Sequence, residues 1–302
     1  MKNYLTICSC YYSPESRRLL ELNFEFIRRE NPEFSFLGLV ANNTRVPFLG
    51  SDAPFGENIQ IIEGAGWPVH QRKWVRGSYH HAAALEKLVP LVTTRFVLFL
   101  DTDFYIVRKN WIKEIPEYMT QNNISFFGVP WHPQHVKKIR YFPAPHSLFI
   151  DLEKINKSTV MFQPDYDFER VPSFRERIIK KIMRIILGRR GEIGIAKDTG
   201  YPLYKRYGRD QNINSECMSP VWDYEPTLLD ILLPDRFSYI PKKTGFIAKK
   251  SFQDFGVFDP THEGWESFLW KGAPFGFHVR GSKKMGDDLN KFKILTEALK
   301  NF

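Results

Sequence analysis

The fold is decided by residues 77–106, which read GSYHHAAALEKLVPLVTTRFVLFLDTDFYI. The first part of this stretch places apolar side chains at helical spacing, which predicts a helix over 77–92. The run RFVLFL at 95–100 has no polar residue after Arg95, as expected of a strand buried on both faces. This strand stops abruptly at Asp101, and ligands in open α/β sheets bind beyond the carboxyl ends of such strands.

The same alternation of strand and helix extends to both sides of this stretch. Apolar runs and helical periodicity predict strands at 3–9, 35–41, 59–63 and 124–129, and helices at 15–30 and near 109–121. Alternation of this kind is typical of an α/β protein with a mostly parallel central sheet flanked by helices. The pattern breaks in the proline-rich segment WHPQHVKKIRYFPAPH, and the second half is less regular. We expect one continuous domain with a soft boundary near residue 130.

Composition limits the classes of partner and compartment. The 302 residues carry a net charge of +9, which favours an anionic partner such as phosphate groups, an acidic membrane face or nucleic acid. Three cysteines cannot form a disulfide framework and indicate a reducing compartment. No apolar run reaches the roughly 18 residues that a membrane-spanning helix needs, and the N-terminal run is too short for a signal peptide. We therefore expect a cytoplasmic protein.

Two carboxylates come directly after the buried strand in the sequence. Asp101 and Asp103 are two residues apart at a strand terminus, so both can face one hard cation. Mn²⁺ and Mg²⁺ take such oxygen ligands, and phosphate oxygens of a substrate complete the shell. The alternative is that the two aspartates cap a following helix or lie in a solvated turn.

In this placement of Asp-x-Asp the chain resembles the GT-A glycosyltransferases, in particular bacterial family-2-like enzymes. The resemblance covers residues 3–130 by pattern and implies a Rossmann-like, nucleotide-sugar-binding half at 1–130 and an acceptor-binding half at 131–302. It implies transfer of a sugar from a UDP-, GDP- or TDP-linked donor to an acceptor hydroxyl, in the synthesis of a bacterial surface polysaccharide. The QxxRW motif of processive family-2 synthases is absent, which argues against a polymerising enzyme.

The resemblance also implies roles for residues outside the Asp-x-Asp. In GFHVRGSKK, His278 corresponds to a third metal ligand, and Arg280, Lys283 and Lys284 then lie near the diphosphate. The alternative is a basic surface turn. Residues at the ends of the first two strands and at the start of the 77–92 helix are positional candidates for donor contacts: Ser9, Cys10, Tyr11, Asn42, Asn43, Arg76, Ser78 and His81.

A catalytic base is needed if transfer inverts the anomeric centre, as we expect here. Asp198 in AKDTGYPLYKRYG resembles the acceptor-side acidic residue of inverting enzymes, and the alternative is a helix cap or Asx turn. His132, His135 and His146 match no zinc spacing. They are interpreted as lining an acceptor cleft with Trp131, or as structural histidines.

The segment FRERIIKKIMRIILGRR at 174–190 predicts a helix with one basic and one apolar face. Such a helix can lie on an anionic membrane surface and bring a peripheral enzyme to a lipid-linked glycan at the inner face of the plasma membrane. The alternative is that its apolar face packs on the core.

Three other functions were weighed against this one. A phosphatase of the haloacid dehalogenase kind also uses Asp-x-Asp after a strand, but on its opening strand and with a different continuation. A nucleotidyltransferase needs a glycine-rich loop after the first strand, and SCYYSPESRR has no glycine. A nucleic-acid-binding protein accounts for the net charge and the aromatic residues but leaves the buried-strand Asp-x-Asp unexplained.

Overall fold

The computed structural model describes residues 5–66, 76–133, 141–165, 198–223, 246–279 and 289–302, together with residues 175 and 178. At residue 76 and at residues 289–291 it describes the backbone alone. The predicted contributions of His135, Arg280, Lys283 and Lys284 lie outside the described residues. So does the predicted helix at 174–190, apart from the two single residues.

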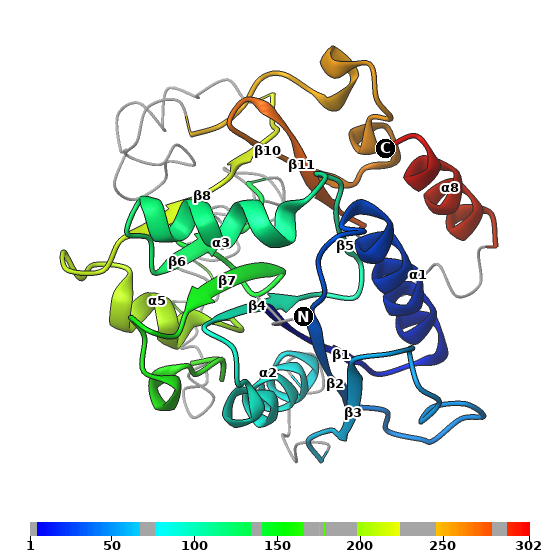
Figure 1. Cartoon of the computed structure of the whole chain (residues 1–302), viewed down its shortest axis with the longest axis vertical. Coiled ribbons are helices and arrows are strands. Elements are labelled where there is room, and N and C mark those ends of the chain that lie inside the picture. Colours follow the sequence, from blue (N-terminus) through cyan, green and yellow to red (C-terminus); the bar gives the residue numbers. More distant parts are fainter. Residues whose placement is uncertain are drawn as a thin grey trace.

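A seven-stranded sheet forms the centre of the molecule, in the order β3-β2-β1-β4-β7-β6-β8 (Figure 1). Its strands are β1 (Leu5–Tyr11), β2 (Leu37–Asn42), β3 (Ile59–Glu63), β4 (Phe96–Leu100), β6 (Phe126–Gly128), β7 (Ser147–Asp151) and β8 (Ser215–Cys217). Strand β1 pairs in parallel with β2 and β4, and β2 pairs in parallel with β3. The predicted α/β class with a mostly parallel central sheet is confirmed.

Strand β7 runs against its neighbours, which the alternating pattern did not predict. It pairs antiparallel with both β4 and β6, and Leu100 at the end of β4 lies opposite Ser147 at the start of β7. An antiparallel neighbour brings its own start to the edge where β4 ends. His146 therefore stands beside Asp101, and the Asp101 N–H donates to the His146 carbonyl at 3.0 Å.

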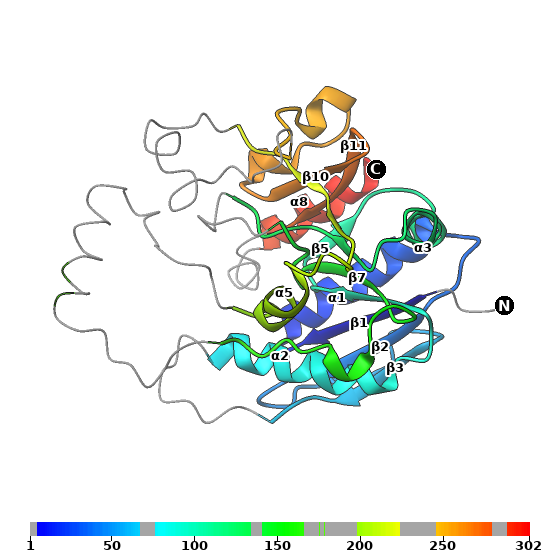
Figure 2. The ribbon, with the colours of Figure 1, turned by 90° about the vertical axis from the view of Figure 1, so that its left-hand side faces the viewer.

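Helices cover both faces of the sheet (Figure 2). Helix α1 (Pro14–Glu30) and α3 (Trp111–Gln121) pack on one face, and α2 (Arg76–Leu88) and α5 (Tyr201–Tyr207) pack on the other. Side chains of β1 alternate accordingly: Ile7 faces the α1 layer and Cys8 faces the α2 layer. Each fully buried aromatic or aliphatic side chain of these layers contributes about 1.5–3 kcal/mol.

The 77–92 helix ends earlier than its pattern predicts. Helix α2 stops at Leu88, and a 3₁₀ turn, η1 (Val89–Leu91), continues it. Pro90 lies inside this turn; it lacks a backbone N–H and cannot continue the α-helical hydrogen bonds. Two further predicted elements, α3 and β6, are present within their predicted ranges, near 109–121 and 124–129.

A second, smaller sheet stands beyond the end of β4, and the strands predicted from the sequence do not include it. Its order is β5-β11-β10-β9, formed by β5 (Phe104–Ile106), β11 (Ala273–His278), β10 (Glu266–Trp270) and β9 (Ser219–Pro220), all antiparallel. It shares a hydrophobic cluster with α8 (Leu289–Lys300) and with Leu19 and Phe26 of α1. The chain passes from β4 into β5 through Asp101, Thr102 and Asp103, so the Asp-x-Asp lies at the junction of the two sheets.

No helix in the described parts of the chain is long and apolar enough to cross a membrane. Three buried cysteines, Cys8, Cys10 and Cys217, are all free thiols. The central sheet takes strands from both sides of residue 130, since β7 and β8 follow it in the chain. The predicted division into a donor half and an acceptor half therefore concerns ligand binding and not separate sheets.

Candidate metal centre

Two backbone hydrogen bonds and one side-chain amide stabilise the turn that carries Asp101 and Asp103. The Phe104 N–H donates to the Asp101 carbonyl at 3.2 Å, and the Val279 N–H donates to the Asp103 carbonyl at 2.9 Å. The buried amide of Asn23 on α1 donates to the Phe104 carbonyl at 2.8 Å. These bonds fix the direction in which both carboxylates leave the turn. No helix follows them, so the alternative of a helix cap does not apply.

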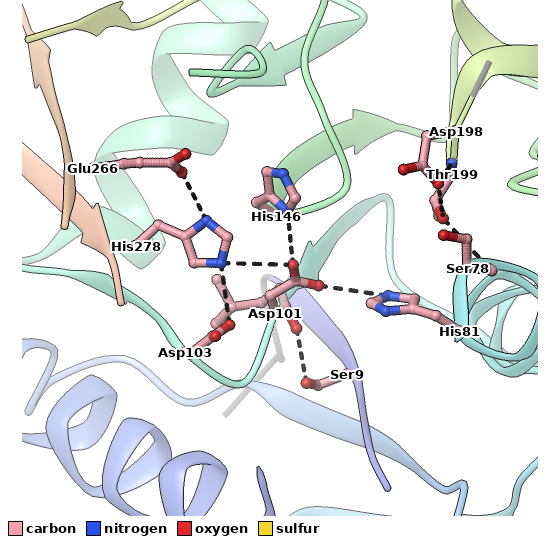
Figure 3. Close-up of polar contacts among 11 residues, drawn as sticks. Ser9, Ser78, His81, Asp101, Asp103, His146, Asp198, Thr199, Glu266 and His278 are labelled. Carbon is pink, nitrogen blue, oxygen red and sulfur yellow. Dashed lines mark hydrogen bonds and ion pairs between the residues drawn. The ribbon is translucent and has the colours of Figure 1, made fainter. Parts of the chain in front are cut away.

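His278 comes to the same place from the last strand of the small sheet. In β11 it lies opposite Phe104, and its Nε2 is 3.2 Å from Asp103 Oδ1 and 4.0 Å from Asp101 Oδ2 (Figure 3). Its other ring nitrogen, Nδ1, is 2.9 Å from Oε2 of Glu266 on β10, and Glu266 is completely buried. The Glu266 carboxylate can accept a hydrogen bond from Nδ1–H, so Nε2 is the nitrogen that faces the two aspartates, and its lone pair could bind a cation there once Nε2 is unprotonated.

His146 and His81 approach Asp101 from two further directions (Figure 3). His146 Nδ1 lies 2.7 Å from Asp101 Oδ2, and His81 Nε2 from α2 lies 3.5 Å from Asp101 Oδ1. The His146 ring packs against His278, with centroids 4.6 Å apart, and edge-on to Trp131 at 4.3 Å. Asp101 is therefore surrounded by three imidazoles that are far apart in the sequence.

The electrostatics of this cluster keep Asp101 ionised. Burial opposes its ionisation, yet the pKa of the Asp101 carboxyl lies below its ordinary value, because the hydrogen bond from His146 and the charges of His81, His146 and His278 outweigh burial. Burial and the nearby Asp101 charge both raise the pKa of the Cys10 thiol, which stays neutral. The groups able to bind a cation here are therefore carboxylate oxygens and imidazole nitrogens, not a thiolate.

The donor atoms fit a divalent metal ion. One ligand atom each of Asp101, His146 and His278 lie within 4.8 Å of one another, a spacing that no other trio of potential ligands matches in the described residues. Carboxylates and neutral imidazoles together suit first-row ions such as Mn²⁺. The buried Glu266 supports the fit, since ligating histidines characteristically donate their second N–H to a carboxylate. Two of the predicted ligands, Asp101 and His278, belong to this trio, whereas the third, Asp103, lies outside it, with its Oδ1 3.2 Å from His278 Nε2.

Comparison with known proteins gives remote structural similarities only. No family model matches the chain, and no curated protein matches it in sequence. One similar solved structure is the mannosyltransferase PcManGT from Pyrobaculum calidifontis in complex with GDP-Man and Mn²⁺, at 12% identity and a TM-score of 0.35. The match covers 61% of this chain and 53% of that one.

Two other solved structures are similar to the chain at the same level. TarS of S. aureus matches at 16% identity and a TM-score of 0.36, over 54% of this chain and 30% of that chain. The galactosyltransferase LgtC in complex with donor and acceptor sugar analogs matches at 15% identity and a TM-score of 0.35, over 51% and 62%. The chain thus spans about half of the first structure and less than a third of the second. Similarity at this level does not establish a function.

The donor contacts predicted at the ends of β1 and β2 have partners inside the fold. Ser9 is buried and its hydroxyl donates to the Leu100 carbonyl at 2.7 Å, and the buried Tyr11 hydroxyl donates to the Ser51 carbonyl. Asn43 is buried and its amide donates to the His80 carbonyl at 3.0 Å. Asn42 donates to Asp52 Oδ1 at 2.5 Å. In this structure, then, these four side chains brace the loops around the site.

The remaining predicted residues lie on the α2 side. The His81 side chain contacts Asp101. The contact of Ser78 is made by its backbone carbonyl, which accepts a hydrogen bond from the Thr199 hydroxyl at 3.4 Å. Asp198 lies beside Thr199, on the side of Asp101 where His81 and Ser78 are drawn, and its Oδ1 accepts from the Thr199 N–H at 2.7 Å (Figure 3). The backbone of Arg76 begins α2, and its side chain is outside the description.

His132 has a different partner from Trp131 and His146, whose rings contact each other. Its ring nitrogen Nε2 contacts the Val221 carbonyl at 3.1 Å, and the residue is buried. It is therefore a structural histidine, one of the two alternatives that the sequence left open. His146 matches neither alternative, because it contacts Asp101.

Sequence reasoning missed Glu266 altogether and assigned His146 to another role. A usable signal for Glu266 was present in ESFLWKGAPFGFHV, where Lys271-Gly272 separates two strand-like runs. Both turn residues have positive φ, 50° and 73°, as in a tight two-residue hairpin. Such a hairpin pairs the start of β10 with the end of β11, and Glu266 indeed lies opposite His278.

Replacing Glu266 with Gln will lower the affinity for Mn²⁺ by about 10–100-fold, because the neutral amide no longer holds the His278 tautomer and basicity. The measurement is calorimetric titration of Mn²⁺ into wild type and variant. Glu216→Gln is the matched control, since Glu216 is also a strand residue and accepts from the Tyr118 hydroxyl at 3.0 Å. Equal affinities of E266Q and wild type would show that Glu266 does not act on the site.

Proposed function

We propose that this chain is a metal-dependent glycosyltransferase that moves a sugar from a nucleotide-sugar donor to an acceptor hydroxyl. The observation that carries the proposal is the meeting of Asp101, Asp103 and His278 at the carboxyl end of β4. The resemblance of the sequence to GT-A glycosyltransferases implies the same three residues as metal ligands. Two of them are separated by 175 residues, and their side chains come within 3.2 Å of each other.

The chemistry follows from where the carboxylates lie. A divalent cation bound to them would neutralise charge that develops on the leaving diphosphate. Asp101 and Asp103 would set the position of the cation, and the contact between His278 and Glu266 fixes the direction from which the His278 ring faces it. His81 on α2 stands at the opposite side of Asp101, where it can contact a donor phosphate.

The finer parts of the proposal rest on the sequence. We assign the base to Asp198, with inversion at the anomeric carbon, and Arg280 and Lys283 to the diphosphate. Residues 1–130 would supply most of the donor site and residues 131–302 the acceptor site. We propose a glycan acceptor in surface polysaccharide synthesis, lipid-linked and reached through the basic segment 174–190 at an anionic membrane.

The rival functions gain no support from the geometry. A phosphatase nucleophile must present a carboxylate oxygen to the phosphorus, whereas one oxygen of Asp101 is engaged by His146 at 2.7 Å and the other lies near His81. A nucleic-acid-binding surface has no need of two carboxylates and three imidazoles gathered at a sheet junction.

The test is calorimetric titration of UDP, GDP and TDP into the protein, with and without Mn²⁺. Wild type should bind one of the three in a Mn²⁺-dependent manner, and Asp103→Ala should abolish that binding. Asp210→Ala, a change in an exposed turn, is the control that should bind as wild type does. Failure of wild type to bind any of the three nucleotides with Mn²⁺ present would refute the proposal.

A further inference from the structure

His146 occupies a position at the candidate metal centre that the Asp-x-Asp and His278 do not account for. It precedes β7, the antiparallel strand, and its Nδ1 is 2.7 Å from the same Asp101 oxygen that lies 4.0 Å from His278 Nε2. His146 is buried, with 7% of its surface exposed, as is His278 with 3%. The two rings lie 4.6 Å apart, tilted by 39°.

The distances are those of groups that can share one ion. Nitrogen and oxygen ligands lie about 2.0–2.2 Å from a first-row cation, which puts neighbouring ligand atoms roughly 3 Å apart. The separations of 2.7 and 4.0 Å about Asp101 Oδ2 bracket that value, and the separation of 3.2 Å between His278 Nε2 and Asp103 Oδ1 matches it. A cation bound by His146 Nδ1 and Asp101 Oδ2 would take the place of the proton that their hydrogen bond now uses, and that proton would be released.

The surroundings restrict His146 to this place. Its ring contacts Trp131 edge-on and packs against His278, and its own carbonyl accepts the Asp101 N–H at 3.0 Å. The backbone and the side chain of His146 therefore both contact Asp101. A ring held in this way loses little side-chain entropy on binding an ion, which favours preorganised ligation over a role as a loosely placed neighbour.

We propose that His146 binds the cation directly, as a fourth protein ligand beside Asp101, Asp103 and His278, and so makes the site select Mn²⁺ over Mg²⁺. This inference rests on the proposed function only in assuming that the site binds a divalent cation. Mg²⁺ demands oxygen ligands and a near-ideal octahedron and dehydrates reluctantly, whereas imidazole nitrogen suits first-row transition ions. A second imidazole therefore strengthens Mn²⁺ binding and leaves Mg²⁺ little to gain.

The experiment titrates Mn²⁺ and Mg²⁺ separately into wild type and His146→Gln, by calorimetry and in the absence of nucleotide. The Gln amide retains a donor for the Asp101 carboxylate but removes the imidazole nitrogen. His278→Gln is the positive control, and His262→Gln, at an exposed histidine of a surface turn, is the negative control. Electron spin echo measurements on Mn²⁺ bound to wild type count the coordinated imidazole nitrogens without any variant.

The expected result is a loss of Mn²⁺ affinity of about 10–100-fold in H146Q, with Mg²⁺ affinity changed by less than about threefold. The echo modulation should report two imidazole nitrogens in wild type. One nitrogen in wild type, or an equal loss of Mn²⁺ and Mg²⁺ affinity in H146Q, would overturn the inference and leave His146 as a positioning residue of Asp101.

The two proposals fail in different ways. If wild type binds Mn²⁺ through two imidazole nitrogens but binds no nucleotide, the glycosyltransferase proposal is refuted while the ligand assignment stands. If wild type binds Mn²⁺ and nucleotide through one imidazole, only the assignment of His146 is refuted. Absence of Mn²⁺ binding to wild type, with or without nucleotide, refutes both.

Discussion

For the proposed glycosyltransferase, Asp101→Asn will lower the rate of sugar transfer by about a thousandfold or more, the size expected when a charged group that stabilises the transition state is removed. Asparagine has nearly the same shape as aspartate and keeps one oxygen for His146, but it loses the negative charge that three imidazoles now surround. The metal position loses its central ligand. The measurement is release of nucleoside diphosphate from whichever UDP-, GDP- or TDP-sugar wild type consumes in the presence of Mn²⁺.

A matched isosteric change separates this effect from a general one. Asp210 lies in an exposed turn, where its Oδ1 accepts from the Asn212 N–H at 2.9 Å. Asp210→Asn should keep wild-type turnover within about twofold, because surface substitutions away from functional groups rarely change stability by more than about 0.5 kcal/mol. Turnover of D101N within tenfold of wild type would contradict a metal role for Asp101, provided that its thermal midpoint shows an intact fold.

Gly128→Ala will destabilise the protein by at least about 3 kcal/mol, the upper range for overpacking a core site. Gly128 ends β6 with φ of +156°, and a Cβ added there would lie 2.0 Å from the Ser147 carbonyl oxygen. That oxygen belongs to β7 and accepts the Val129 N–H at 3.1 Å, so it cannot move without breaking the strand pairing. The measurement is the midpoint of urea or thermal unfolding.

Gly264→Ala is the comparison for Gly128. Gly264 also has a positive φ, 72°, but no atom lies within 4 Å of an added Cβ. Its substitution should cost only about 1–2 kcal/mol for the left-handed backbone. Equal shifts for the two variants would mean that the close contact of β6 with β7 is not what requires glycine at position 128. Because His146 directly precedes Ser147, G128A should also weaken Mn²⁺ binding in whatever fraction remains folded.

The central sheet was predictable because its information is local. Five apolar residues in a row at Phe96–Leu100, with helical periodicity before them, specify a buried strand after a helix wherever they occur. The positions of β1, β2 and β3 follow from runs of the same kind. The sharp stop at Asp101 marked the edge of the sheet where ligands bind, and two carboxylates there predicted a cation site.

The direction of β7 and the existence of the small sheet were not predictable in this way. A run such as Ser147–Asp151 is equally apolar whether it pairs parallel or antiparallel. The choice depends on which strands it meets, and those contacts are made across the fold. Its antiparallel direction is what carries His146 to the end of β4. Read along the chain, His146 is only one of three histidines in a proline-rich segment.

The sequence alone therefore determined the α/β class, the buried strand and the pair of carboxylates at its end. Only the tertiary structure decided which other groups join them. Besides His81 on α2, Asp101 contacts His146, 45 residues along the chain, and Asp103 contacts His278, 175 residues along it, with Glu266 behind His278. Helix and strand periods reach across a few residues. Contacts between residues this far apart are set by the order and direction of strands in two sheets, which no local pattern encodes.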